Sequence, residues 1–491
     1  MNTKQPWTLS RRDFMRVSAA ATILSSGSSG LYGMDMLPPP MKRRFGRIDF
    51  DVTTMGLGGQ AAIQWTPDDV DPVAIITKAL ALGINYLDTS NAYGPSQSNF
   101  GKAFRKLHLV PGRPGYDRRR RESTFVTTKT MVRWAEGGYP TLPNVRNYTH
   151  GDPAGGAVAD LKRSLSQLFG DDNGAYADEA YIDLMLIHNV VTIEEVDVVY
   201  KGLDTPLTKN EPLGALAALR DYRDGTNRTG LNPGREKRIR HLGFSGHHDA
   251  AVMIEMIQRD RDNLLDAMLV SINVNDRRYL NMQHNVIPVA QAKNMGIIGM
   301  KVFADGAMYT KPARWSETPA DVVRLIGTET LPSKPLIEYA LTAPGLHTLI
   351  IGIGEIHEDP SRCQLVQNYC AAQIRQDALT AQERRAMETL GRRAKDGRTN
   401  WFQQPDRGLT PPRNARIEPG DRIRLTWDTA YAGDEPLSHY VITCDGRELD
   451  TVRHTPQTSK KPFYFETDAG KEFSITSVDT AGRRASTGTL P

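Results

Sequence analysis

Short apolar runs alternate with amphipathic segments over most of the chain. The runs are apolar at nearly every position rather than at every second one, which is typical of parallel strands that helices cover. The segments between them have the three-to-four-residue period of a helix, as at 71–82, 156–169 and 250–260. The pattern predicts strands at 53–58, 84–88, 124–129, 181–188, 240–246, 268–273, 296–303 and 347–353.

Eight strand–helix units favour a closed (β/α)8 TIM barrel over an open doubly wound sheet. No GxGxxG motif follows the first predicted strand, which weakens the dinucleotide-fold alternative. Long connections at 131–156 and 189–212 follow strands, so we expect them at the C-terminal face of the barrel, where they can form a substrate pocket. The loop at 223–238 precedes a strand and is expected at the opposite face, without a catalytic role.

The hydrophobic pattern changes near residue 403, and only strand-like runs and turns follow. Their short spacing indicates a small all-β immunoglobulin-like sandwich, with Trp427 and Tyr440 as core aromatics. The segment resembles a fibronectin type III module. The predicted fold class is therefore α/β, a TIM barrel followed by this sandwich. The strands of the sandwich are expected at 421–429, 437–446, 447–453, 462–468 and 472–484.

The N-terminal segment has the features of a targeting signal. The sequence SRRDFM at 10–15 precedes a short stretch rich in alanine and serine, and it resembles the twin-arginine export signal. The stretch is too short and too weakly apolar to span a membrane, so we expect no stable membrane insertion. The export machinery is the expected partner, and the expected location is periplasmic or secreted. An accidental arginine pair in a tail is the alternative. The predicted domains are a signal and linker at 1–40, a barrel at 41–400 and a sandwich at 412–491.

Composition and charge exclude several classes of function. The formal net charge of +4 is small for 491 residues, and no basic stripe is present, so nucleic acid is not an expected partner. Three cysteines cannot form a disulfide framework, and none has a CxxC partner or a histidine cluster beside it. We therefore expect no metal site.

Three consecutive predicted strands end in ionisable residues, namely Asp88, Lys129 and His188, and Tyr93 follows the first of them. Each residue alone has a simpler explanation: a core histidine, a surface lysine, a turn-capping aspartate or a loop tyrosine. In a barrel, however, the C-terminal ends of neighbouring strands converge on one pocket. The combination therefore predicts a site that holds a carboxylate, a phenol, an ammonium and an imidazole.

These four groups suit proton donation coupled to hydride transfer. An ammonium beside a phenol favours the phenolate and so lowers the pKa of a tyrosine from its usual value near 10. Asp88 can supply the counter-charge that a buried Lys129 needs. Neutral His188 can hydrogen-bond a carbonyl oxygen, and Tyr93 can act as the general acid or base.

The same residues lie in segments that resemble the aldo-keto reductase superfamily. In that resemblance the catalytic Asp, Tyr, Lys and His correspond to Asp88, Tyr93, Lys129 and His188, and the cofactor is NADP or NAD, lying across the C-terminal mouth of the barrel. The resemblance is carried by RRFGRIDFDVTTMGLGG, GINYLDTSNAYGPSQSNFGKAF, TFVTTKT, YIDLMLIHNV and GFSGHHDA. The cofactor-binding residues that it implies are Gly59, Ser245, Asn273, Lys301, Phe303, Gly352, Gly354, Arg362 and Asn368.

The cofactor side departs from the family pattern in three places. In the sixth strand Asn273 is present, but aliphatic residues stand where the family has a glutamine and a stacking aromatic. The family's Ser-Asn pair after the fifth strand, which holds the carboxamide, is Ser245-Gly246 here. Glu355 stands where relatives that prefer NADPH often place a Lys or Arg, and it would repel a 2′-phosphate; Arg362 can compensate. A structural turn without phosphate contact is the alternative for the glycines at 352 and 354.

The leading hypothesis is an exported oxidoreductase that acts on a small-molecule carbonyl or alcohol, with a sugar as one candidate. Exported enzymes have no free nicotinamide pool, so a cofactor bound before export would favour a redox-neutral reaction on a sugar. The rival is a binding protein that keeps the barrel and the four residues without turnover.

Overall fold

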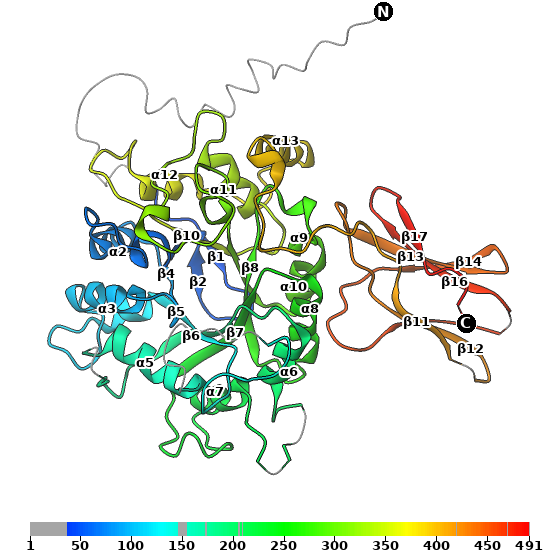
Figure 1. The fold of residues 1–491 in the computed structure, drawn as a ribbon, viewed down its shortest axis with the longest axis horizontal. Helices are drawn as coiled ribbons and strands as arrows, with labels where there is room; N and C mark the ends of the chain where they lie inside the picture. Colours follow the sequence, from blue (N-terminus) through cyan, green and yellow to red (C-terminus); the bar gives the residue numbers. More distant parts are fainter. Residues whose placement is uncertain are drawn as a thin grey trace, which may run out of the picture. The chain divides into compact units, whose positions relative to one another are not determined.

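A computed structural model describes residues 37–145, 155–171, 174–204, 207–208, 210–418, 420–468 and 470–490. Eight parallel strands close into a barrel in the order β10-β3-β4-β5-β6-β7-β8-β9, and helices lie around its outside (Figure 1). All eight predicted barrel strands are present, so the predicted TIM-barrel class is confirmed. The strands are β3 (Met55–Gly58), β4 (Tyr86–Asp88), β5 (Phe125–Met131), β6 (Ile182–His188), β7 (Ile239–Gly246), β8 (Leu265–Ser271), β9 (Gly296–Met300) and β10 (Thr348–Gly352).

The helices begin where the sequence supplies helix-starting residues. In α2, Pro72 occupies the first turn, where its missing N–H costs nothing, and the Asp71 side chain accepts a 2.8 Å hydrogen bond from the Val73 N–H. The α-helices are α2 (Pro72–Ala81), α3 (Ser96–Lys106), α4 (Arg118–Glu122), α5 (Ala157–Phe169), α6 (Ile193–Tyr200), α7 (Ala215–Asp224), α8 (Ala250–Arg259), α9 (Met282–Asn285), α10 (Ile287–Ala292), α11 (Ser333–Leu341), α12 (Gln364–Ala371) and α13 (Ala381–Gly391).

A two-stranded antiparallel hairpin, β1 (Lys42–Arg44) and β2 (Asp51–Thr53), precedes the barrel. Its connection carries Phe45 and Ile48, which belong to the buried cluster inside the barrel together with Tyr86 and Phe125. The hairpin therefore fills the N-terminal end of the barrel with aromatic and aliphatic side chains. The sequence analysis did not predict this hairpin.

The C-terminal residues form two antiparallel sheets, β11-β12-β15 and β14-β13-β16-β17. Trp427 and Tyr440 are fully buried between them, with ring centroids 5.5 Å apart, which confirms their predicted place in a shared core. The fibronectin type III subtype and the domain boundaries stay predictions. The strands are β11 (Arg413–Glu418), β12 (Ile423–Asp428), β13 (Leu437–Cys444), β14 (Arg447–Arg453), β15 (Phe463–Thr467), β16 (Phe473–Asp479) and β17 (Arg484–Ser486).

The predicted twin-arginine signal lies outside the described residues. Within the part of the chain that the structure describes, none of the helices has the length and apolar character needed to cross a membrane.

Candidate active site

The four residues predicted to act together lie at one end of the barrel. Asp88 is the last residue of β4, Lys129 lies within β5, and His188 is the last residue of β6. Tyr93 lies in the turn that joins β4 to α3. Because β4, β5 and β6 are hydrogen-bonded neighbours, their C-terminal ends bring these side chains into one cluster.

A buried ion pair forms the base of this cluster. The Lys129 Nζ donates hydrogen bonds to Asp88 Oδ1 and, at 2.7 Å, to the carbonyl oxygen of Thr89. Burial raises the pKa of Asp88 and lowers that of Lys129, and in each case the opposite charge of the partner works against the shift. The second carboxylate oxygen, Oδ2 of Asp88, has no hydrogen-bond partner among the described residues. Keeping both charges here costs folding free energy, which points to a chemical role.

The phenol of Tyr93 lies between the ammonium and the imidazole. Its hydroxyl oxygen is 3.4 Å from Nε2 of His188, and the two rings meet edge to face with centroids 5.5 Å apart. The Lys129 Nζ is 4.8 Å from the centroid of the Tyr93 ring. This arrangement can favour the phenolate and can pass a proton to or from a group placed over Tyr93 and His188.

The loop that carries Tyr93 is anchored by a buried asparagine that the sequence analysis did not single out. The Asn91 Nδ2 donates to the carbonyl oxygens of Lys129 and Asp160, both at 3.1 Å, and to Ser164 Oγ at 2.8 Å. These bonds tie the loop after β4 to β5 and α5, so the phenol is held over the ion pair. The feature of the sequence that indicates this anchoring role is a polar residue between the end of a buried strand and the tyrosine.

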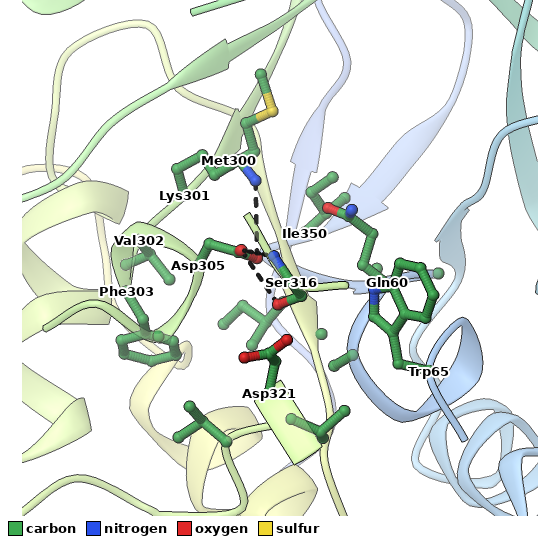
Figure 2. A pocket seen from close by; sticks show the side chains of 18 of the residues that line it. Gln60, Trp65, Met300, Lys301, Val302, Phe303, Asp305, Ser316, Asp321 and Ile350 are labelled. Atoms are coloured by element: carbon green, nitrogen blue, oxygen red, sulfur yellow. Dashed lines mark hydrogen bonds and ion pairs between the residues drawn. The ribbon is translucent and has the colours of Figure 1, made fainter. Parts of the chain in front are cut away.

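A cavity of about 120 Å³ adjoins the cluster, and Asp88 and Tyr93 line it together with residues at the ends of β3, β9 and β10. At Gly59 an added Cβ would lie 2.6 Å from the carbonyl oxygen of Asp88, so only glycine fits there. Figure 2 shows Lys301, Asp305 and Ser316 on one side of the cavity and Gln60 and Trp65 on the other. The cavity therefore joins the cluster of Asp88 and Tyr93 to the β9 and β10 ends.

Lys301 gives this cavity a cation. Its Nζ is 3.9 Å from Asp305 Oδ1 and 4.6 Å from the centroid of the Trp315 ring, and burial lowers its pKa. Asp305 is held more closely by Lys311, whose Nζ lies 2.6 Å from its other oxygen. Lys301 is therefore only weakly neutralised and is suited to meet an anionic group of a ligand.

Four of the nine predicted cofactor-binding residues line this cavity, namely Gly59, Lys301, Phe303 and Gly352. A fifth, Asn368 in α12, is buried, and neither its amide nitrogen nor its amide oxygen has a hydrogen-bond partner among the described residues. Such an unsatisfied amide is costly unless a ligand pairs with it.

Asn368 and the remaining four predicted residues lie outside the cavity lining. The Ser245 hydroxyl accepts a 2.9 Å hydrogen bond from the Asn189 N–H. Asn273 is fully buried and donates to Asn400 and to the carbonyl oxygen of Lys301. The Gly354 N–H donates to Gln364 Oε1 at 2.6 Å, and Arg362 is exposed in the turn before α12.

The segment before the C-terminal sheets explains why Asn273 is engaged within the protein. Asn400 is buried and also donates to Asp276, at 3.2 Å, so this segment packs against the end of β8. Trp401 and Phe402 follow, and their rings contact those of Trp315 and His247. The sequence analysis missed this aromatic cluster, because its members come from three distant segments.

Comparison with known proteins identifies the barrel. The aldo/keto reductase family model matches residues 54–323, which is more than half of the chain. The chain belongs to the aldo/keto reductase family. Within this family the chain resembles the uncharacterized oxidoreductase YqkF of Bacillus subtilis strain 168, with 26% identity over 159 residues. That match covers 32% of this chain and 41% of YqkF, so it spans less than half the length of the relative.

Solved structures of the family are also similar to this chain. A candidate aldo-keto reductase from Pseudomonas aeruginosa is 21% identical, with coverage of 67% of this chain and 96% of its own and a TM-score of 0.39. An aldo/keto reductase from Klebsiella pneumoniae in complex with NADP and acetate is 16% identical, with coverage of 71% and 94% and a TM-score of 0.42.

Proposed function

We propose that this aldo/keto reductase family member transfers hydride between a nicotinamide cofactor, NADP or NAD, and the carbonyl or alcohol carbon of a small-molecule substrate. The observation that carries the proposal is the position of the Tyr93 hydroxyl, 3.4 Å from His188 Nε2 and on the ring that faces the buried Lys129–Asp88 pair. The desolvation of this incompletely bonded ion pair reduces stability, and a catalytic role beside the phenol accounts for its presence.

Each of the four residues has a role in this proposal. A bound nicotinamide supplies or accepts the hydride. Tyr93 gives its proton to the carbonyl oxygen during reduction and takes it back during alcohol oxidation. His188 hydrogen-bonds the same oxygen and orients it. Lys129 stabilises the phenolate that Tyr93 becomes, and Asp88 holds Lys129 in place.

Residues that line the cavity, together with Asn368 in α12, fit a dinucleotide in charge and in hydrogen bonding. Lys301 can pair with a phosphate, the unpartnered amide of Asn368 can bind a base, and Gly59 and Gly352 leave room for close approach. Family membership and the NADP of the Klebsiella pneumoniae structure support the assignment. The cavity of about 120 Å³ is smaller than the roughly 300–1,000 Å³ of ligand pockets, so we expect its lining to rearrange when a dinucleotide binds.

The choice between NADP and NAD depends on the charges near β10. Glu355, which the sequence analysis expected to repel a 2′-phosphate, faces Arg324 at 3.5 Å. Arg324 also contacts Asp69 through both oxygens, at 2.6 and 2.8 Å. We infer that Arg324 partly offsets Glu355, which keeps both cofactors possible.

We also propose that the protein is exported by the twin-arginine pathway and acts outside the cytoplasm. Because that route carries folded proteins, a cofactor bound before export would travel with the enzyme. A sugar substrate suits such a protein, since oxidation and re-reduction of one carbon would leave the bound cofactor unchanged. In this proposal the C-terminal sandwich, which resembles a fibronectin type III module, is a spacer or interaction domain.

The experiment that tests the function has two steps. First, purified protein is denatured, and the released small molecules are examined for nicotinamide absorbance; protein freed of ligand is then titrated with NADPH and NADH by fluorescence. Second, turnover of reference aldehydes is compared between the wild type and Tyr93→Phe. We expect tight cofactor binding by both proteins and a loss of kcat of about 10²–10⁴-fold in the variant, the usual contribution of a general acid.

The second candidate is a binding protein without turnover. It is favoured by the engagement of Ser245 and Asn273 inside the protein, where the family's carboxamide contacts are expected. No binding of either nucleotide, with the fold intact, would support this candidate and contradict the enzyme. Equal turnover by Tyr93→Phe and the wild type would contradict the proposed role of Tyr93.

A further inference from the structure

Ser90 lies against Nδ1 of the His188 imidazole, the ring nitrogen that does not face Tyr93. It follows Asp88 and Thr89 in the loop after β4, and its side chain is fully buried. Its Oγ is 3.2 Å from Nδ1 of His188 and accepts a 3.1 Å hydrogen bond from the Ala92 N–H. The hydroxyl therefore connects the loop that carries Tyr93 to the ring that faces Tyr93.

The hydrogen-bond directions around Ser90 follow from counting its donors and acceptors. A serine hydroxyl has one hydrogen to donate, and a buried hydroxyl that does not donate loses free energy. Among the described residues, His188 Nδ1 is the acceptor that lies within hydrogen-bond distance of Ser90 Oγ. If His188 instead donated from Nδ1, the serine hydrogen would have no acceptor there. The arrangement that satisfies both groups is Ser90 O–H donating to an unprotonated Nδ1.

We propose that Ser90 is a positioning residue that holds neutral His188 as the tautomer with its hydrogen on Nε2. Nε2 is the nitrogen that faces the Tyr93 hydroxyl, at 3.4 Å. With the hydrogen on Nε2, His188 is a donor toward Tyr93 and toward any oxygen bound beside it. With the hydrogen on Nδ1, a lone pair would face the same place and could only accept.

The consequence for catalysis rests on the proposed function. During reduction the hydride adds to the carbonyl carbon, the electron pair of the carbonyl bond moves to the oxygen, and the proton of Tyr93 passes to that oxygen. Tyr93 becomes a phenolate, which regains a proton from solvent afterwards. The Nε2–H of His188 stabilises the negative charge on both oxygens. The opposite tautomer would accept a hydrogen bond from the Tyr93 hydroxyl and so hold the proton on Tyr93. Its lone pair at Nε2 would also repel the phenolate.

The tautomer itself can be measured without any reaction. In protein labelled with ¹⁵N on histidine, long-range proton–nitrogen correlation spectra distinguish a protonated Nε2 from a protonated Nδ1, and His188→Gln identifies the signals of residue 188. We expect protonated Nε2 in the wild type and a shift toward protonated Nδ1 in Ser90→Ala. Protonated Nδ1 in the wild type, or an unchanged spectrum of residue 188 in Ser90→Ala, would overturn the proposal.

Two further variants separate this effect from a loss of packing. Ser271→Ala removes a hydroxyl that is also fully buried but has no hydrogen-bond partner among the described residues, so the His188 signals should not move. Ser90→Thr keeps a hydroxyl and should restore the wild-type tautomer. In kinetic assays we expect Ser90→Ala to lower kcat at least about tenfold, the effect of one hydrogen bond near the reacting group, with little change in KM.

The two measurements distinguish failure of this inference from failure of the proposed function. A protein that shows the expected tautomers but no turnover would retain the role of Ser90 in holding His188 and lose the enzymatic proposal. Turnover that is unchanged in Ser90→Ala, with the tautomer altered, would mean that catalysis does not depend on the donor at Nε2, and the catalytic part of the inference would fail.

Discussion

Each end of the barrel contains a buried ion pair, and the two pairs differ in how many partners their carboxylate oxygens have. At the N-terminal end, one oxygen of the Asp183 carboxylate forms an ion pair with Arg121 Nη1 at 2.8 Å and accepts a hydrogen bond from the Val126 N–H at 3.0 Å, and its other oxygen faces Arg240. At the C-terminal end, Asp88 is bound by Lys129 through one oxygen only. Similarly buried carboxylates thus have both oxygens engaged at one end and, among the described residues, one oxygen engaged at the other.

The pKa directions of two strand carboxylates agree with this contrast. Burial alone would raise the pKa of Asp266, near the N-terminal end of β8, but its hydrogen bond with His241 and its attraction to Arg47 outweigh burial and lower it. The pKa of Asp88 is raised, because burial outweighs the attraction to Lys129. Charge therefore stabilises the N-terminal end and costs stability at the C-terminal end, where chemistry can use it.

Two buried asparagines show the same contrast in uncharged side chains. Each is only 1% exposed. Asn232, in the loop before β7, donates to three carbonyl oxygens and accepts from the Glu236 N–H. Asn368, in α12, has no partner for its amide among the described residues. The fold alone accounts for the amide of Asn232, whereas no contact among the described residues accounts for that of Asn368, which we propose binds the cofactor.

The largest expected effect comes from breaking the ion pair at the C-terminal end. Lys129→Met leaves the Asp88 charge buried and unpaired, so we expect a loss of about 3–5 kcal/mol of unfolding free energy at pH 7. The loss should shrink as the pH falls toward 4, because Asp88, whose pKa is already raised, takes up a proton in the folded state. Urea unfolding at several pH values measures the loss of stability and its dependence on pH. The kcat of Lys129→Met should fall at least about a hundredfold.

The matched double variants test whether the pair is held for function. Asp88→Asn with Lys129→Met removes both charges, and we expect stability equal to the wild type or up to about 4 kcal/mol higher, without activity. Arg121→Met with Asp183→Asn should stay destabilised, because Arg121 also donates to two carbonyl oxygens, those of Thr124 and Tyr181. Among the described residues, Lys129 donates to only one carbonyl oxygen besides Asp88, so its loss leaves fewer groups without a partner. Equal stability losses in the two double variants would contradict the contrast between the ends.

The barrel could be predicted from sequence because its signals are local and repeated. Each strand is a continuous apolar run, and a helix-forming segment follows it, as α3 follows the run at 84–88. The β1–β2 hairpin was missed because its strands are only three residues long. In the C-terminal sheets, β11 reads RNARIE, whose charged residues conceal an edge strand, and β17 has three residues.

The site could be predicted only in part. Asp88 and His188 end their strands and Lys129 lies two residues before the end of β5, so barrel geometry alone brings them together. The engagement of Asn273 by Asn400 depends on residues 127 positions apart, and no local pattern announces such a contact. Ser90 was overlooked for a similar reason: its role depends on which nitrogen of His188 it faces, and that is set by packing.

The next prediction compares the two asparagines through the same substitution. Asn232→Leu leaves three carbonyl oxygens and one N–H without their partner, so we expect a loss of about 3 kcal/mol of unfolding free energy. Asn368→Leu removes an amide that has no partner, so ligand-free protein should be as stable as the wild type or more stable. Nucleotide affinity should fall about tenfold in Asn368→Leu and stay unchanged in Asn232→Leu. A large loss of stability in ligand-free Asn368→Leu would show that its amide is bonded within the protein.

The smallest expected effect is the pH dependence at Asp266. Because its pKa is lowered in the folded state, its charge contributes stability above the unfolded value of about 3.8 and loses that contribution as the pH falls through the folded pKa. Asp266→Asn should therefore be about 1–2 kcal/mol less stable than the wild type at pH 7, and the difference should shrink below pH 4. In the Lys129→Met background, replacing Asp88 by Asn should give the opposite sign, a gain in stability that grows as the pH rises above 4. Urea unfolding of both pairs of proteins between pH 3 and pH 7 checks this. If the two signed stability differences changed with pH in the same direction, the charges at the two ends of the barrel would not differ in their effect on stability.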